Sequence, residues 1–393
     1  MRAPSLRPKA RAEGWADGCQ HGLRRRGRLL DNKSDWTTHE RRVHFRQARL
    51  RAGVTAGTNA MRCISGEIHV VGDELNLDYT LIPGQAFRWF RESDGAWVGV
   101  VSGTIIKLWR ENGRVVYEAR GNCVDDEFIR RYFRLETDIK DVYAYLVARD
   151  ERIAPVISRF KGLRVLGQEP EETLMTYLCT TANSVPRIVR SIECLAIRFG
   201  ERIGEFEGRE YYSFPTVEAL SRAEVDRLCE IPGLCFRGRH LKAVVEQLIE
   251  RPPGWLHSLK EATYEEARSE LLNIRGIGPK IADCVLLFSL GKNEAFPVDT
   301  HLWNVVGKRY LTELAGRRLT RASYDYVVAY FQRLFGCYAG WAQEYLFYDD
   351  LYPNGVAPVI DRIAQGRNSQ KSRAKRVGER DPAKRESRSK VMT

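Results

Sequence analysis

The amino-acid sequence predicts an α+β fold, in which an N-terminal antiparallel β-rich domain packs on a mainly α-helical domain. Residues 66–120 are rich in β-branched and aromatic residues, and the turn sequences "SDG" and "ENG" between them are typical of β-hairpins. From about residue 124, apolar residues recur at i, i+3 and i+4 spacing, which is the period of an amphipathic helix. We therefore divide the chain as follows: a disordered basic leader (1–60), a β-rich domain (61–123), a helical domain (124–360) and a disordered basic tail (361–393).

The basic residues are concentrated at the two ends of the chain. Residues 1–60 contain 14 Lys/Arg against five Asp/Glu, and residues 366–393 contain ten against three. The net charge of +12 comes from these ends, so charge alone does not mark the folded body as a nucleic-acid binder. The leader has no apolar periodicity, which predicts disorder. It is a loose basic arm, a transit peptide, or a stretch before the true start at Met61.

Two runs supply strands of the β-rich domain, "AWVGVVSGTIIKLW" (96–109) and "RVVYEAR" (114–120). Helical spacing then covers most of the remaining chain. The predicted helical segments are 125–135, 141–160, 170–182, 185–200, 216–231, 239–250, 263–274, 323–336 and 340–352.

The segment "LLNIRGIGPKIA" (271–282) predicts two helices joined by a short turn at Gly276 and Gly278. Two glycines let the backbone turn tightly and approach another molecule closely. The free N–H groups at the start of the second helix form an anion site. This is the physical basis of a helix-hairpin-helix that binds a nucleic-acid phosphate, and Pro279 suits the first helical position.

Lys280 has the wrong charge for its place at a helix start, because the helix dipole is already positive there. If the side chain also faces a closed pocket, desolvation disfavours its ammonium form further, and a neutral amine is a nucleophile that can form a Schiff base. The alternative is a solvated surface lysine. Asp299 precedes the predicted helix "THLWNVVGKRY" (300–310), where a carboxylate caps the helix and can still turn its second oxygen toward a pocket.

The segment "GIGPKIADCVLLFSLGKNEAFPVDTHLW" (276–303) resembles the helix-hairpin-helix Gly/Pro-Asp motif of the 8-oxoguanine DNA glycosylase/lyase family. Further segments resemble the family in the same order, so that the resemblance extends over residues 66–355. These segments are "IPGQAFRW" (82–89), "FKGLRVLGQEPEETLMTYLCTTANSVPRI" (160–188), "GLCFRGRHL" (233–241) and "GWAQEYLF" (340–347).

The resemblance implies a base-excision repair enzyme that flips the damaged base out of the duplex. Lys280 matches the catalytic lysine, which attacks the sugar C1′ and forms a Schiff base that supports β-elimination. Asp299 matches the aspartate that stabilises positive charge on the sugar.

The resemblance also assigns the lesion pocket. Phe347 and Cys284 match the two faces of a base sandwich, although ordinary core packing is the alternative for each. Gln343 matches the amide that reads the Watson–Crick edge. Gly84 matches the carbonyl that accepts the N7–H present on 8-oxoguanine and absent from guanine.

For the DNA around the lesion, His301 matches a phosphate-contacting histidine, and we expect Asp350 to orient it. Arg187 and Arg237 match arginines that hold the orphaned cytosine, and Phe236 matches an aromatic wedge.

One position departs from the family. Ala182 stands where well-known members have a cytosine-contacting asparagine, and Asn183 follows it. Alanine cannot donate to cytosine, so either selectivity for C is relaxed or Asn183 substitutes.

The implied partner is double-stranded DNA containing 8-oxoguanine, with the chain acting as a monomer on chromosomal DNA, in the cytoplasm of a prokaryote or the nucleus of a eukaryote. Nine scattered cysteines without a C-x-x-C pair indicate a reducing, intracellular setting and argue against a cysteine-ligated metal. We expect no cofactor, and no apolar run is long enough for a membrane span. The alternatives are a glycosylase of the same superfamily for another damaged base and a DNA-binding protein without chemistry. The pairing of Lys280 with Asp299 opposes the second.

Overall fold

The computed structural model describes residues 63–70, 72–121 and 124–353. The predictions for the leader, for a start at Met61 and for the basic tail lie outside the described residues. The described residues form one compact unit, and the division between a β-rich and a helical domain stays a prediction. Within the described residues, no helix is long and apolar enough to cross a membrane.

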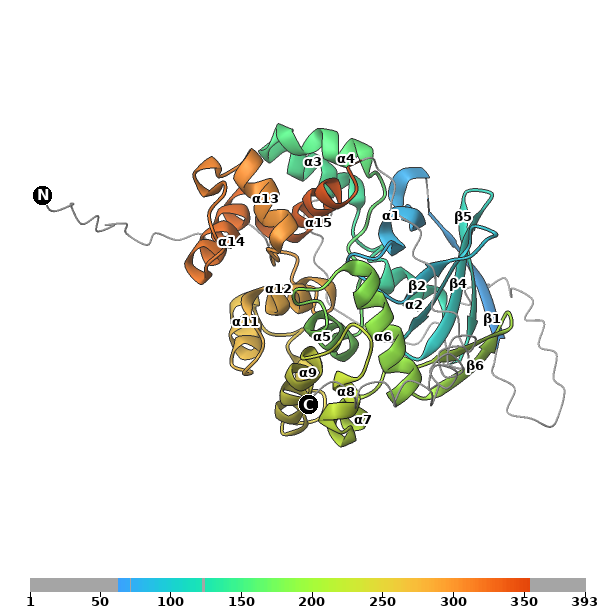
Figure 1. The fold of residues 1–393 in the computed structure, drawn as a ribbon. Coiled ribbons are helices and arrows are strands. Elements are labelled where there is room, and N and C mark those ends of the chain that lie inside the picture. The colour runs from blue at the N-terminus through green and yellow to red at the C-terminus, as the bar shows by residue number, and fades with distance from the viewer. Residues whose placement is uncertain (1–62, 71, 122–123, 354–393) are drawn as a thin grey trace, which may run out of the picture. The chain divides into compact units, whose positions relative to one another are not determined.

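The predicted antiparallel sheet is present and has five strands in the order β1-β5-β4-β3-β2 (Figure 1). Its strands are β1 (Cys63–His69), β2 (Trp89–Arg91), β3 (Trp97–Val101), β4 (Thr104–Glu111) and β5 (Arg114–Arg120). The "ENG" turn joins β4 to β5, with positive φ at Asn112 and Gly113, as a tight hairpin turn requires. The first predicted run is two strands, because Ser102 and Gly103 also take positive φ and make a second two-residue turn between β3 and β4.

Alternate side chains of the sheet face two different layers. One face packs against α1 (Leu77–Leu81) and α2 (Asp126–Tyr132) in a core that includes Trp97, Leu108 and Tyr117. The other face packs its Val98 and Val100 in a smaller cluster.

A β-hairpin packs on that second face, whereas the sequence predicted only helices after residue 124. β6 (Arg202–Phe206) and β7 (Arg209–Tyr212) form an antiparallel hairpin. Its Phe206 and Tyr211 pack on the sheet. The turn residues Glu207 and Gly208 both have positive φ. A Glu-Gly pair is not one of the usual two-residue hairpin turns, so the sequence carried only a weak signal for this hairpin.

Each helical segment predicted after residue 124 is present, two of them are divided, and the short helix α10 (Trp255–Ser258) was not predicted. Segment 141–160 breaks at Asp150, whose side chain caps the 3-10 turn that follows, and segment 216–231 breaks at Ala223 and Glu224. The helices of this part are α3 (Ile139–Arg149), α4 (Ala154–Arg159), α5 (Pro170–Leu178), α6 (Val185–Phe199), α7 (Val217–Arg222), α8 (Val225–Cys229), α9 (Arg237–Ile249), α10 (Trp255–Ser258), α11 (Tyr264–Leu272), α12 (Pro279–Phe288), α13 (Thr300–Arg309), α14 (Arg321–Phe335) and α15 (Ala339–Leu351).

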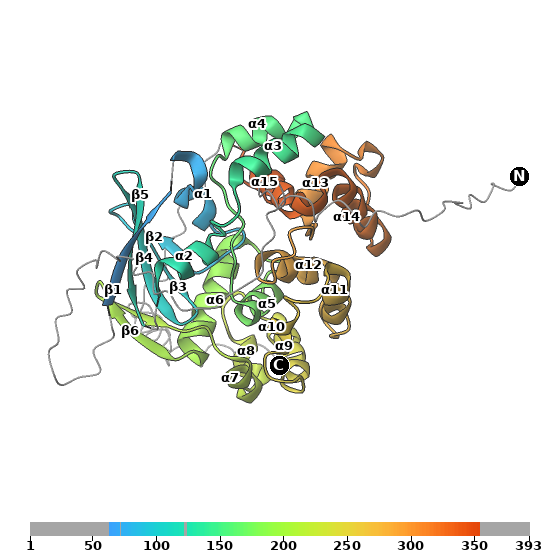
Figure 2. The same ribbon diagram turned by 180° about the vertical axis from the view of Figure 1, so that it is seen from behind.

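The central helix of this arrangement is α12. In Figures 1 and 2 it lies between two groups of helices, one formed by α3, α4 and α13–α15 and the other by α5, α9 and α11. Eight of its ten residues are buried. Its N-terminal end and the segment before α13 therefore meet where the two groups face each other.

Candidate active site

A cleft of about 920 Å³ opens at the N-terminal end of α12. It brings together residues that are far apart in the sequence. Of the predicted site residues, its lining includes Gly84, Asn183, Gly276, Gly278, Lys280, Asp299, His301 and Phe347. Most of the predicted site is therefore assembled around one cavity.

The hairpin before α12 has the predicted form, with Pro279 as the first helical residue and Gly278 as the N-cap. Gly276 has φ +108°, and a Cβ there would lie 2.9 Å from His240 Nε2, so this position requires glycine. Among the described residues, none apart from its chain neighbours has an atom within 4 Å of the place that a Cβ on Gly278 would take. The neighbouring helix α9 holds the turn, because His240 Nε2 lies 2.7 Å from the Gly276 carbonyl and the Gln247 amide pairs with both backbone groups of Arg275 at 2.9 Å.

Lys280 is half-buried at the cleft. Its Nζ donates to Thr180 Oγ1 at 3.2 Å and lies 4.7 Å from the centre of the Tyr177 ring. The Tyr177 hydroxyl donates to the Gln85 carbonyl, and its ring stacks on Phe288. An aromatic face attracts a cation, so the resting contacts suit an ammonium group and hold it at the cleft wall. Neither Tyr177 nor Thr180 was singled out from the sequence.

Asp299 is the N-cap of α13, as predicted. Its Oδ1 accepts the Leu302 backbone N–H at 2.9 Å. Because the residue also lines the cleft, the cap fixes the carboxylate at the same cavity as the Lys280 amine.

Tyr348 of α15 and Tyr352, which directly follows that helix, hold the loop that carries Gly84. The Tyr348 hydroxyl donates to the Ile82 carbonyl at 3.0 Å and the Tyr352 hydroxyl to the Pro83 carbonyl at 2.9 Å. A Cβ on Gly84 would lie 3.0 Å from the Tyr348 hydroxyl, so a side chain at this position is crowded. The Gly84 backbone is thus held at the cleft by the helix that also carries Phe347.

The predicted pairing of His301 with Asp350 is present, with His301 Nδ1 3.0 Å from Asp350 Oδ2. The His301 ring also meets the Phe347 ring edge to face, with centroids 6.0 Å apart. The imidazole is therefore oriented from two sides at the mouth of the cleft.

Cys284 and Gln343 are not among the cleft-lining residues. They are buried, with 2% and 5% of their surface exposed, and lie behind the wall. Burial raises the pKa of the Cys284 thiol to about 12, so it is a neutral apolar group. Among the described residues, Gln343 Oε1 is a buried oxygen without a hydrogen-bond partner, which makes its amide able to accept a bond from a ligand or water.

The residues predicted to face the opposite strand are differently placed. Arg187 is exposed and Phe236 is 63% exposed. Arg237 is buried, and its guanidinium donates to the carbonyls of Thr181 and Ala182. A cytosine contact by Arg237 would therefore require these bonds to rearrange.

The Asn183 amide is also engaged by the protein. Its Nδ2 donates to the carbonyls of Cys179 at 3.2 Å and Gly233 at 3.1 Å. This side chain ties two loops together, so the structure gives no sign that it substitutes for an asparagine at Ala182.

Glu344 is a buried acid that sequence analysis missed. It is 1% exposed, and its burial, together with the Asp299 carboxylate, raises its pKa to about 8. Gln343 and Phe347, also on α15, were predicted from their positions in the motif "GWAQEYLF". Nothing in the spacing of residues around Glu344 distinguishes it from other helical residues.

The free energy of unfolding of the unsubstituted protein should fall as the pH rises toward 8, and we expect Glu344→Gln to abolish this fall. Between pH 4.5 and 8 the folded protein holds a proton on Glu344 that the unfolded chain has released, so the free energy of unfolding falls as the pH rises. For the unsubstituted chain this fall is about 2 kcal/mol between pH 6 and 8. Urea unfolding at both pH values measures it, and the exposed Glu313→Gln is the control. Equal pH dependence in all three proteins would contradict the prediction.

An antiparallel sheet is followed by a set of helices, in which a lysine lies directly behind a glycine hairpin and an aspartate caps the next helix at the same cleft. This combination defines a helix-hairpin-helix DNA glycosylase. Comparison with known proteins narrows the class. Residues 67–174 match the family model of the 8-oxoguanine DNA glycosylase N-terminal domain.

Two relatives extend the match over most of the chain. The N-glycosylase/DNA lyase OGG1 of Arabidopsis thaliana is 30% identical, covering 71% of this chain and 78% of the relative. The N-glycosylase/DNA lyase of Saccharomyces cerevisiae is 30% identical, covering 72% and 85%. The 8-oxoguanine glycosylase/lyase of Clostridium acetobutylicum, solved with double-stranded DNA containing cytosine opposite 8-oxoG, superposes with a TM-score of 0.64 at 28% identity, covering 72% of this chain and 93% of that chain. The chain belongs to the 8-oxoguanine DNA glycosylase/lyase family.

Proposed function

We propose that this protein is a bifunctional 8-oxoguanine DNA glycosylase/lyase that acts in base-excision repair of chromosomal DNA. The observation that carries the proposal is the meeting of Lys280 and Asp299 at one cleft beside the glycine hairpin. A protein that only binds DNA needs neither group at such a cavity.

In the first step the Lys280 Nζ forms a bond to the deoxyribose C1′ while the bond from C1′ to the base breaks. The bonding electrons leave with the base, which takes up a proton. Asp299 stabilises the positive charge that develops on the sugar, where exclusion of water makes a carboxylate most effective. The amine must give up its proton before it attacks, and with it the contact to the Tyr177 face.

In the second step the sugar opens to a Schiff base between Lys280 and C1′. The cationic imine makes the C2′ proton acidic, and its removal expels the 3′ phosphate by β-elimination. The strand is thereby cut.

The lesion is recognised at the Gly84 side of the cleft. The Gly84 carbonyl accepts the N7–H of 8-oxoguanine, and the two tyrosine bonds to Ile82 and Pro83 keep that acceptor fixed. Phe347 supplies one face of the base site. Cys284 and Gln343 are buried behind the cleft wall, and they contact the base when the residues in front of them move.

The glycine hairpin and His301 hold the DNA backbone. At the N-terminal end of α12, the backbone N–H groups of Gly278 and Lys280 have no backbone partner among the described residues and can bind a phosphate, and His301 adds a second contact. Phe236 fills the gap that the flipped base leaves in the stack. Arg187 holds the unpaired cytosine, and Arg237 joins it once its bonds to the Thr181 and Ala182 carbonyls rearrange.

The direct test is a nicking and borohydride-trapping assay on duplexes that carry 8-oxoguanine opposite each of the four bases. We expect cleavage and a covalent adduct on the lesion strand, with the highest rate opposite cytosine. A panel of alkylated purines and oxidised pyrimidines tests the alternative substrates. Processing of those lesions without 8-oxoguanine would refute the proposed substrate.

Substitution of Ala182 by asparagine should change both the stability of the protein and its selectivity for the base opposite the lesion. The residue has φ +48°, a left-handed conformation that costs alanine about 1 kcal/mol and that asparagine tolerates better. We expect Ala182→Asn to raise the free energy of unfolding by roughly 0.5–1 kcal/mol. It should also improve selectivity for cytosine opposite the lesion by about 1–3 kcal/mol, as measured by single-turnover rates on the four duplexes at one salt concentration.

Ala182→Gly is the matched control, because glycine accepts the same backbone conformation and has no amide. It should leave the preference among the four opposite bases unchanged. If Ala182→Asn also leaves that preference unchanged, Arg187 and Arg237 carry the reading of cytosine without help from position 182.

A further inference from the structure

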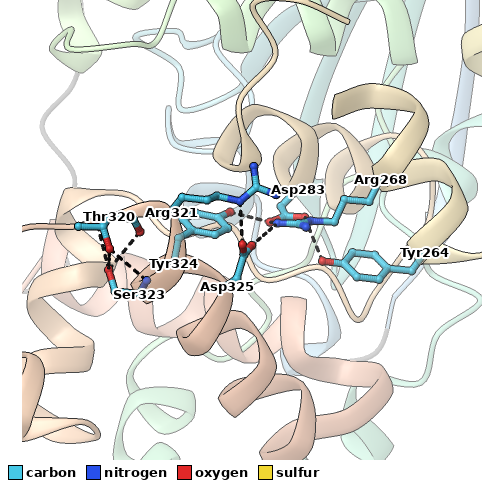
Figure 3. Close-up of polar contacts among 8 residues, drawn as sticks. All are labelled: Tyr264, Arg268, Asp283, Thr320, Arg321, Ser323, Tyr324 and Asp325. Carbon is cyan, nitrogen blue, oxygen red and sulfur yellow. Dashed lines mark hydrogen bonds and ion pairs between the residues drawn. The ribbon is translucent and has the colours of Figure 1, made fainter. Parts of the chain in front are cut away.

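A buried polar network lies behind the wall of the cleft, centred on Asp283 of α12 (Figure 3). Asp283 is fully buried, and three side chains converge on it. The Arg268 Nε donates to Oδ1 at 2.8 Å, the Tyr264 hydroxyl donates to Oδ1 at 3.1 Å, and the Tyr324 hydroxyl donates to Oδ2 at 2.6 Å. Burial raises the pKa of the Asp283 carboxyl, and the Arg268 guanidinium opposes that rise.

The Tyr324 hydroxyl does more than satisfy this carboxylate. It also accepts the backbone N–H of Val298 at 3.4 Å, and Val298 directly precedes Asp299. Asp283 itself lies one helical turn after Lys280, on the same helix. One oxygen atom thus joins the helix that carries the lysine to the segment that carries the aspartate.

The outer part of the network fixes the position of Tyr324. Arg268 also reaches Asp325 at 3.2 Å, and Arg321 pairs with Asp325 at 2.7 Å. Thr320 and Ser323 form a capping box at the start of α14, as the left side of Figure 3 shows. Two arginines and two aspartates balance in charge, and the first turn of α14 is held at both its cap and its side chains.

A buried ion pair contributes little net stability, because desolvation of both partners offsets their attraction. The geometry that the network imposes is therefore the more informative feature. Tyr324 also lines the cleft, so this residue lies at the boundary between the core and the reaction site.

We propose that Tyr324 is a positioning residue, which sets the Asp299 carboxylate relative to the Lys280 amine through its shared bonds to Asp283 and Val298. This inference rests on the proposed function. When the hydroxyl is removed, Arg268 and Tyr264 still hold Asp283 and hence α12. The segment before Asp299 loses its link, so the aspartate is the group that becomes misplaced.

The test compares Tyr324→Phe with Tyr264→Phe. Each substitution removes one hydroxyl from the same buried carboxylate and keeps the ring, and only Tyr324 contacts Val298. Two rates are measured for each variant: single-turnover excision of 8-oxoguanine, and borohydride trapping at a preformed abasic site. Excision uses Lys280 and Asp299 together, whereas trapping at an existing aldehyde requires the lysine amine.

For Tyr324→Phe we expect excision to slow by about tenfold, since a displacement of an ångström or less is enough for such a loss, and abasic-site trapping to stay within about twofold. For Tyr264→Phe both rates should stay within about twofold. Thermal unfolding of both variants checks that their cores are comparably stable. The ratio of the two rates is independent of how much protein is folded.

Three results would overturn the inference: equal slowing of excision in the two variants, no slowing in Tyr324→Phe, or slowing of abasic-site trapping in parallel with excision. Failure of the proposed function itself would be seen in the unsubstituted protein, which would then neither excise 8-oxoguanine nor become trapped on it. The two failures are therefore distinguishable.

Discussion

Lys280→Gln is expected to abolish base excision and covalent trapping on DNA, while binding to the duplex persists. The substitution keeps a polar side chain of similar length, which can still donate to Thr180 Oγ1 at the cleft wall. It removes the amine, and an amide nitrogen is not a nucleophile because its lone pair is delocalised. The hairpin with Gly276 and Gly278 is unchanged, so the phosphate site at the start of α12 remains.

The measurements are single-turnover excision, borohydride trapping and a binding titration on the same duplex. Lys308→Gln is the matched control: this exposed lysine near the end of α13 lies outside the cleft, and its loss changes the net charge by the same amount. A Lys280→Gln variant that is still trapped on DNA would show that another amine is the nucleophile. Equal weakening of DNA binding in both variants would mean only that a positive charge has been lost.

The parts of the site that depend on local sequence could be predicted. The glycine turn, Pro279 at the first helical position and the Asp299 cap follow from backbone rules that act over three or four residues. The pairing of His301 with Asp350 was expected from the family resemblance and is present at 3.0 Å.

The contacts that cross the fold could not be predicted. Tyr177 and Thr180 reach Lys280 from about 100 residues away, and Tyr324 reaches Asp283 across 41 residues. The hydrophobic periodicity of the sequence does not indicate contacts between residues far apart in the chain, because it only assigns each residue to an amphipathic helix. Glu344 escaped notice for the same reason, since its unusual environment comes from burial and not from its sequence neighbours.

Arg237 shows a different limit. Its place in "GLCFRGRHL" predicted a DNA contact. In the structure its guanidinium donates hydrogen bonds to the backbone carbonyls of Thr181 and Ala182. Sequence similarity indicates which residue type occupies a position. It does not show which neighbouring groups form hydrogen bonds with that side chain. Here the competing acceptors are the main-chain oxygens of Thr181 and of Ala182 itself, the position at which the chain departs from its family.

Asp299→Asn should keep the helix cap and lose the chemistry. Asparagine caps a helix about as well as aspartate, so its side-chain oxygen can still accept the Leu302 N–H and the free energy of unfolding should change by only a few tenths of a kcal/mol. The negative charge that stabilises the developing sugar cation is gone. We expect the single-turnover excision rate to fall by about 10²–10³-fold, the range found when one stabilising group is removed from a preorganised site.

Asp299→Ala completes the comparison, because it removes the cap together with the charge. It should lower the free energy of unfolding by about 1 kcal/mol and excise at most as fast as Asp299→Asn. If Asp299→Asn excises at the rate of the unsubstituted protein and only Asp299→Ala is impaired, the residue acts through the start of α13 alone. Asp299→Asn and Asp299→Ala both lack the carboxylate, and only Asp299→Ala lacks the helix cap. If Asp299→Asn loses excision rate at unchanged stability, the loss of rate is therefore due to the missing negative charge.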